Sequence, residues 1–143
     1  MGIRRAGWNQ DGALLGRRAE DGCDYENMAD LSLKKTSPDS VVANRDDHEL
    51  YTAPVGSYKA NPWGLKDILG NVAEWVEDCY TANYDNARKD GIAATTDDCG
   101  SRVVRGGSWL NFPRFLRAAY RNDFTPDYRI DRIGFRVART VTR

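Results

Sequence analysis

The chain has 143 residues, of which 41% are apolar and 29% are charged. That composition predicts one globular domain over residues 1–143, with a core large enough to fold alone. No apolar run approaches the roughly 20 residues that cross a bilayer, which excludes a membrane-spanning segment. The first residues also lack the apolar stretch of a secretory signal.

The formal charge is zero overall but unevenly distributed. Residues 1–100 hold 11 Lys and Arg against 18 Asp and Glu, whereas residues 101–143 hold 10 Arg against 3 Asp. A basic tail is compatible with nucleic-acid binding. We favour the simpler interpretation, in which the arginines pair within the domain, so a nucleic-acid partner is disfavoured.

Three cysteines and one histidine are present, namely Cys23, Cys79, Cys99 and His48. Without a CxxC pair or further histidines, a Cys/His zinc site is not expected. A Cys79–Cys99 bridge would suit an oxidising compartment, but the odd count leaves one thiol over. Free buried cysteines are therefore the favoured state.

The first part of the chain, residues 1–50, is loop-rich and shows no sustained period, apart from one short helix or strand. Within it, residues 36–50 predict an exposed excursion. Prolines and glycines over residues 52–64 then indicate turns. From Leu65 to Cys79 apolar residues recur at helical spacing, but Gly70 interrupts the pattern and a strand from Val72 fits equally well.

Two later segments favour strands, on either side of the stretch that follows the Gly-Gly pair. A polar connector over residues 81–100 leads into SRVVRGGSW, which predicts a strand ending in a bend at Gly106 and Gly107. Near the C-terminus, IGFRVARTV alternates Ile133, Phe135 and Val137 with smaller or polar residues. Such alternation is typical of a half-buried strand.

Three blocks follow one another in a specific order: NPWGLKDILGNVAEW at 61–75, RVVRGGSW at 102–109 and RIGFRVAR at 132–139. Together they resemble the C-terminal half of the formylglycine-generating-enzyme family, also called the sulfatase-modifying-factor family. The resemblance covers residues 50–139 well and residues 20–35 weakly.

The resemblance implies an α+β, C-type lectin-like fold of the formylglycine-generating-enzyme subtype, with a small twisted antiparallel sheet, two helices and much irregular loop. It also favours a short helical turn at Leu65–Leu69, followed by a strand through Trp75. In a loop-rich domain of this kind, Trp63, Trp75 and Trp109 are expected to be core anchors.

Asn71 and Glu74 lie where members of the family hold a calcium ion through oxygen ligands. Two structural roles fit the same residues equally well, because Asn71 can cap a turn and Glu74 can pair with an arginine. Calcium therefore stays open as a cofactor, and no cofactor is required for the function favoured below.

The resemblance also bears on catalysis. Formylglycine-generating enzymes depend on a redox-active cysteine pair just after the Gly-Gly-Ser-aromatic block, and Asn111 and Leu116 occupy those two positions here. Without a thiolate there is neither a nucleophile nor a soft metal ligand. We therefore expect a protein that is not an enzyme.

The C-terminal part, residues 102–139, contains a segment at 110–132 in which two sets of residues alternate irregularly. One set matches the frame of the family pattern: Pro113, Arg114, Arg117, Ala119, Arg121, Pro126, Asp127, Arg129 and, just after the segment, Gly134. The other set occupies positions that are Asn-rich in many members: Leu110, Asn111, Phe112, Phe115, Tyr120, Asn122, Asp123, Phe124, Tyr128, Ile130, Asp131 and Arg132.

The second set resembles the variable region of a diversity-generating-retroelement target protein, in which adenine-directed mutagenesis rewrites asparagine codons on a C-type-lectin scaffold. Rewriting AAC or AAT cannot give Lys, Glu, Gln, Met or Trp. None of these five residues occurs at the twelve positions. Hereafter these twelve are called the variable positions.

Tyr, Phe, Asp and Arg on a rigid frame have the composition of a binding surface. The sequence thus predicts a non-catalytic protein that binds a protein ligand or surface receptor, displayed on a virion or cell surface. The alternative is a formylglycine-generating-enzyme-like oxidoreductase relative, or a catalytically inactive subunit of one. Single phenylalanines of the set could instead belong to the core.

Overall fold

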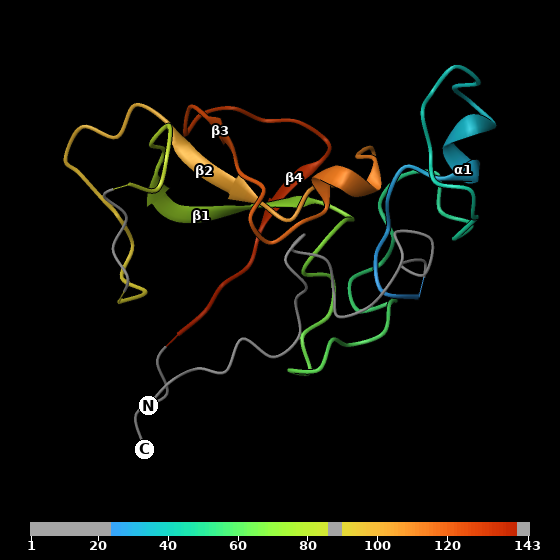
Figure 1. The fold of residues 1–143 in the computed structure, drawn as a ribbon, viewed down its shortest axis with the longest axis horizontal. Helices are drawn as coiled ribbons and strands as arrows, with labels where there is room; N and C mark the ends of the chain where they lie inside the picture. Colours follow the sequence, from blue (N-terminus) through green and yellow to red (C-terminus); the bar gives the residue numbers. More distant parts are fainter. Residues whose placement is uncertain (1–23, 86–89, 140–143) are drawn as a thin grey trace.

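The computed structural model describes residues 24–85 and 90–139, so the loops predicted for residues 1–23, and Cys23, lie outside the described residues. Within these ranges the chain forms one small sheet surrounded by irregular loops (Figure 1). The elements, in chain order, are α1 (Leu31–Lys34), β1 (Ala73–Cys79), β2 (Arg102–Arg105), the 3-10 helix η2 (Pro113–Phe115), β3 (Asn122–Phe124) and β4 (Ile133–Phe135).

The sheet has the strand order β3-β2-β1-β4. β2 is antiparallel to both β1 and β3, whereas β4 runs parallel to β1. The predicted all-antiparallel sheet is therefore wrong, and the sheet is mixed. Because β3 and β4 lie at opposite edges, the loop over residues 125–132 has to cross one face of the sheet to connect them (Figure 1).

The helical content is smaller than expected. Over the described residues there is one four-residue α-helix, α1, and the short 3-10 helix η2. No helical turn forms at Leu65–Leu69, because positive φ angles at Asp67 (55°) and Gly70 (75°) interrupt any right-handed helical run. The apolar spacing there reflects a tight series of bends that buries Leu69.

The two main strands are confirmed. β1 begins at Ala73 and runs through Trp75, as the family resemblance implied. β2 ends at Arg105, and the next two residues form the predicted bend with positive φ angles, 89° at Gly106 and 71° at Gly107. Gly106 also permits close packing, because a Cβ there would lie 2.9 Å from the Ile68 carbonyl oxygen.

The core lies between the N-terminal loops and the segment around the Gly-Gly bend. One buried cluster contains Met28, Ala43, Leu69 and Leu116, and another contains Ala29, Leu33 and Trp109. Residues 36–50 are therefore not a wholly exposed excursion, since Ala43 belongs to the first cluster. Its amide donates to the Ala29 carbonyl at 2.9 Å.

The three tryptophans behave differently from one another. Trp109 is buried, as predicted, whereas Trp75 is half-buried and Trp63 is 49% exposed. The expectation of a half-buried final strand also fails in part, because Phe135 is 77% exposed and Val137 is 84% exposed. β4 is an edge strand, so the alternation in its sequence does not ensure that both of its faces are covered.

Cys79 and Cys99 form a disulfide, contrary to the predicted free thiols. Cys79 ends β1 and lies opposite Arg102 at the start of β2. The connector from residue 80 to 101 therefore returns to the end of the strand that it left. This return brings the two Cα atoms to 5.5 Å, a separation that a disulfide spans without strain on the backbone.

Candidate ligand-binding pocket

A pocket of about 310 Å³ lies on the face of the sheet that the 125–132 loop crosses. Its floor includes Ala73 of β1 and Val104 of β2. Paired residues on neighbouring strands point to the same side of a sheet. Asn122 pairs with Val104 and Ile133 pairs with Ala73, so all four strands contribute to one face.

Eight of the twelve variable positions line this pocket: Leu110, Asn111, Tyr120, Asn122, Phe124, Tyr128, Ile130 and Arg132. They come from the turn after the Gly-Gly bend, from strand β3 and Tyr120 shortly before it, and from the crossing loop. The remaining four, Phe112, Phe115, Asp123 and Asp131, do not line it.

One wall is aromatic. The rings of Phe124 and Tyr128 are stacked, with centroids 4.4 Å apart and planes inclined by 5°. Trp75 meets Phe124 edge-on at 6.4 Å. A turn in which the Tyr128 amide donates to the Thr125 carbonyl at 2.9 Å sets the start of the crossing loop. The stacked pair is thus supported by the sheet on one side and a hydrogen-bonded turn on the other.

Another part of the lining is the turn after the Gly-Gly bend, which Asn111 stabilises. The Asn111 Oδ1 accepts hydrogen bonds from the Ser108 amide at 2.9 Å and from the Ser108 hydroxyl at 3.0 Å. Its backbone carbonyl accepts from the Ala29 amide at 3.1 Å. Asn111 therefore has a structural role at the edge of the pocket, while its neighbour Leu110 is exposed.

The phenylalanines of the segment are neither core nor fully exposed. Phe112, Phe115 and Phe124 are all half-buried. Phe115 packs against Tyr120 with centroids 5.2 Å apart, and the Arg114 guanidinium lies 4.6 Å from the centroid of the Phe115 ring. By contrast Leu116, at the second family cysteine position, is only 3% exposed and belongs to the core.

Two frame arginines have the structural role that was predicted. The Arg117 Nε donates to the Arg114 carbonyl at 2.7 Å, and an Arg121 Nη donates to the Thr81 carbonyl at 2.9 Å. Arg121 also lies over the Tyr84 ring at 4.0 Å. Backbone carbonyls outnumber carboxylates as partners of these side chains, because irregular loops leave carbonyls without strand partners.

The two residues considered for calcium both have protein partners. The Asn71 side chain accepts from the Ala53 amide at 2.9 Å and donates to the Ala53 carbonyl at 3.2 Å. Glu74 accepts from Arg136 at 2.8–3.1 Å, and that hydrogen bonding raises the pKa of Arg136. The described residues contain no cluster of three or more His, Cys, Asp or Glu side chains arranged to hold a metal.

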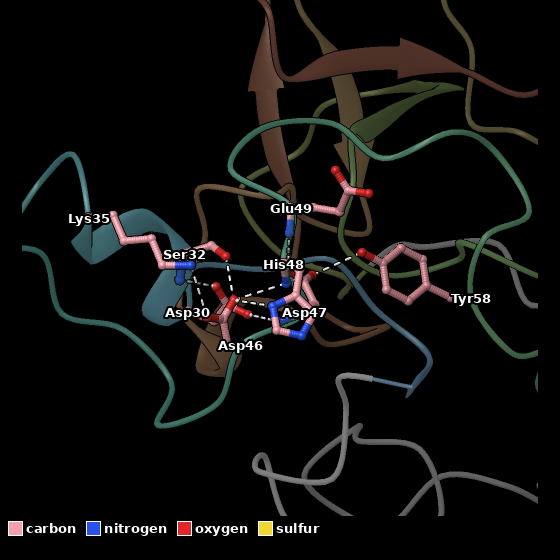
Figure 2. Close-up of polar contacts among 8 residues, drawn as sticks. All are labelled: Asp30, Ser32, Lys35, Asp46, Asp47, His48, Glu49 and Tyr58. Atoms are coloured by element: carbon pink, nitrogen blue, oxygen red, sulfur yellow. Dashed lines mark hydrogen bonds and ion pairs between the residues drawn. The ribbon is translucent and has the colours of Figure 1, made fainter.

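A polar network near the N-terminal end of the described chain was missed by the sequence reasoning (Figure 2). Asp30 caps α1 through the Ser32 amide at 2.8 Å and accepts from the Asp47 amide at 2.7 Å. The Tyr58 hydroxyl donates to Asp47 at 2.9 Å. Burial raises the pKa values of both Asp47 and Tyr58.

The outer side of this network is more exposed. Asp46 accepts hydrogen bonds from the Ser32 hydroxyl and from Lys35, and the first of these lowers the pKa of Asp46 most. The one available signal was Asp30, a strong helix N-cap residue placed directly before Leu31. The network ties α1 to the loop at 46–49 and is therefore structural (Figure 2).

The fold and pocket define a class of protein: a loop-rich α+β domain in which a short sheet and the segment after a Gly-Gly bend enclose a pocket. The chain belongs to the sulfatase-modifying factor enzyme 1-like domain family, whose family model matches residues 13–141. This match confirms the family resemblance seen in the three sequence blocks.

The relatives include enzymes of two different kinds. The formylglycine-generating enzyme of Streptomyces coelicolor is 37% identical over 105 residues, which is 68% of this chain and 32% of that enzyme. The serine/threonine-protein kinase Pkn1 of Chlamydia trachomatis is 37% identical over 147 residues, which is 99% of this chain and 24% of the kinase. The chain thus spans about a third or less of these relatives.

Two solved structures are similar. PvdO from Pseudomonas aeruginosa superposes with a TM-score of 0.66 and 34% identity over 79% of this chain and 38% of that one. Treponema denticola variable protein 1 superposes with a TM-score of 0.51 and 30% identity over 63% of this chain and 32% of that one. No helix in the described ranges has the length and apolar character to cross a membrane.

Proposed function

We propose that this domain is a non-catalytic binding protein, with a C-type lectin-like scaffold, that recognises a protein ligand or surface receptor through the variable positions of residues 110–132. The observation that carries the proposal is the convergence of eight of those twelve positions on one pocket. They are scattered in sequence, and composition alone did not require them to meet.

The physical character of the pocket supports a binding role. Its aromatic wall is half-exposed, and rings of Tyr and Phe provide contact area at a small entropy cost. The surrounding frame is fixed by backbone hydrogen bonds and by arginine contacts to carbonyls. A rigid frame lowers the cost of ordering the surface when a ligand binds. The similarity to Treponema denticola variable protein 1 favours the same interpretation.

The residues at the two family cysteine positions support a non-catalytic role. Asn111 is engaged with Ser108, and Leu116 is packed in the core. Neither side chain supplies a thiolate, which that oxidation chemistry needs as nucleophile and soft ligand. The alternative function, a formylglycine-generating-enzyme-like oxidoreductase or an inactive subunit of one, draws its support from the enzyme relatives.

Two measurements separate these functions. Sequencing the DNA around the gene tests diversification directly: we expect a second, near-identical copy of the 110–132 coding stretch with AAC or AAT at the variable positions, beside a reverse-transcriptase gene. Absence of such a copy would contradict diversification. Oxygen consumption with a cysteine-containing peptide and copper tests catalysis, and turnover there would contradict the non-catalytic assignment.

A further inference from the structure

The pocket has a marked chemical asymmetry. Its lining combines apolar and aromatic side chains, including those of Leu110, Phe124, Tyr128 and Ile130, with polar groups. Among the residues that line it, Arg132 carries the only formal charge. Such a combination selects for a ligand that presents an apolar group and an anion close together.

The guanidinium of Arg132 is available for a ligand. Among residues 24–85 and 90–139 it has one polar side-chain partner, the Asp131 carboxylate, which an Nη meets at 3.4 Å, at the long end of the hydrogen-bond range. The Arg132 side chain is 37% exposed and that of Asp131 is 67% exposed, so this ion pair contributes little. An arginine has five N–H donors, which leaves most of them free for a carboxylate.

The main chain holds this arginine in place. The Arg132 carbonyl accepts from the Ala73 amide at 2.9 Å, and the next residue, Ile133, begins β4 beside β1. The side chain therefore extends from a fixed point at the end of the crossing loop. Its position at the pocket is fixed in part by the contacts of the main chain with β1.

We propose that the pocket binds a carboxylate attached to an aromatic or aliphatic group, as in an acidic peptide segment, with Arg132 pairing the carboxylate and the Phe124–Tyr128 stack contacting the apolar part. The inference rests on the proposed function and names the ligand chemistry of the same site. A volume of about 310 Å³ suits one side chain and its adjoining peptide group, at the lower end of small-ligand pockets.

Three small peptide probes test this proposal by NMR titration of the full chain. N-acetyl-phenylalanine carries a terminal carboxylate, N-acetyl-Asp-Phe-amide carries a side-chain carboxylate, and N-acetyl-phenylalaninamide is neutral. We expect at least one carboxylate probe to bind about tenfold more tightly than the neutral probe, with shifts at the amides of Leu110, Tyr120 and Ile130. The carboxylate probe that binds more tightly shows whether the pocket recognises a terminal or a side-chain carboxylate.

Two variants show whether Arg132 is responsible. Arg132→Gln should reduce the ratio of the affinities for the carboxylate and neutral probes to about one, while leaving the affinity for the neutral probe unchanged. Arg129→Gln is the matched control, because it removes one positive charge from the same loop without altering the pocket lining. An equal loss of preference in both variants would overturn the assigned contact in favour of a general charge effect.

The remaining outcomes are also decisive. Equal or tighter binding of the neutral probe, with the same amide shifts, would overturn the carboxylate assignment and leave the pocket as a binding site. Absence of shifts at these amides with all three probes at about 10 mM would overturn the assigned ligand class. The template-repeat search decides the proposed function independently of all of these results.

Discussion

Residues 24–58 and residues 110–132 are both loop-rich and polar in sequence, yet they use their side chains in opposite ways. The first region directs polar groups inward, so that Asp30 is 1% exposed and is bonded to two backbone amides. The second leaves large aromatic groups half-exposed over a pocket. In an irregular fold, therefore, polarity along the sequence does not reveal which loops form the frame and which face a ligand.

The largest effect on stability is expected at Gly70, where two segments of backbone approach each other closely. A Cβ on Gly70 would lie 2.1 Å from the Asn27 carbonyl oxygen, and Gly70 also has a φ of 75°. Gly70→Ala should destabilise the fold by more than about 4 kcal/mol or prevent folding. Gly100→Ala is the control, since nothing lies within 4 Å of its Cβ position. Equal denaturation midpoints for the two variants would contradict this role of Gly70.

Two leucines in neighbouring turns allow a direct comparison of a core residue with a pocket residue. Leu116 is 3% exposed in the core, whereas Leu110 is 38% exposed at the pocket. Chemical denaturation should show a loss of about 2–5 kcal/mol for Leu116→Ala and of less than about 1 kcal/mol for Leu110→Ala. A Leu110→Ala cost as large as that of Leu116→Ala would mean that the pocket residue is part of the core.

The disulfide lies at the C-terminal end of β1. Cys79 and Cys99 are 20 residues apart in sequence, and a closed loop of that size stabilises a fold by about 3 kcal/mol. The double variant Cys79→Ser, Cys99→Ser should lose about that much in urea denaturation. A double variant as stable as the parent under oxidising conditions would contradict the bridge.

The smallest effect concerns the pH dependence of the buried network. Burial raises the pKa of Asp47 above its ordinary value of 3.8, so the folded state holds the proton more tightly than the unfolded state does. The contribution of this group to stability is therefore greatest below pH 3.8 and declines as the pH rises through its raised pKa.

The variant Asp47→Asn removes this titration while keeping a side chain that can accept from Tyr58. Relative to the parent, it should gain stability as the pH increases through that window. Thermal denaturation of both proteins over a pH series measures the difference. A constant difference between the two at all pH values would contradict a raised pKa at Asp47.

Local patterns in the sequence predicted the parts of the fold that depend on neighbouring residues. The segment SRVVRGGSW with its glycine pair located β2 and its bend, and the family blocks located β1 through Trp75. The direction of β4 could not be predicted in this way, because alternation is the same in parallel and antiparallel strands. The Cys79–Cys99 disulfide was considered but not favoured, because spacing along the chain does not show that the connector returns to β1.

Eight of the twelve variable positions line one pocket, and their role in binding stays a prediction. The positions at which this chain differs from an asparagine-rich family pattern include residues that the fold brings together at one pocket. The sequence pattern could not distinguish Asn111 from the other variable positions. Its residue type fits the pattern, but its side chain stabilises the turn by accepting hydrogen bonds from Ser108. The acidic network at Asp30 and Asp47 was missed because carboxylates in a polar stretch are more commonly solvated.

The central claim is that the frame folds independently of most residues that face the pocket. A protease-resistance selection on a library with NNY codons at the variable positions tests it most directly, with the frame positions Pro113, Arg121 and Gly134 randomised for comparison. We predict that Leu110, Tyr128 and Arg132 accept most residues, while Asn111 and the frame positions do not. Equal intolerance at pocket and frame positions would contradict the account.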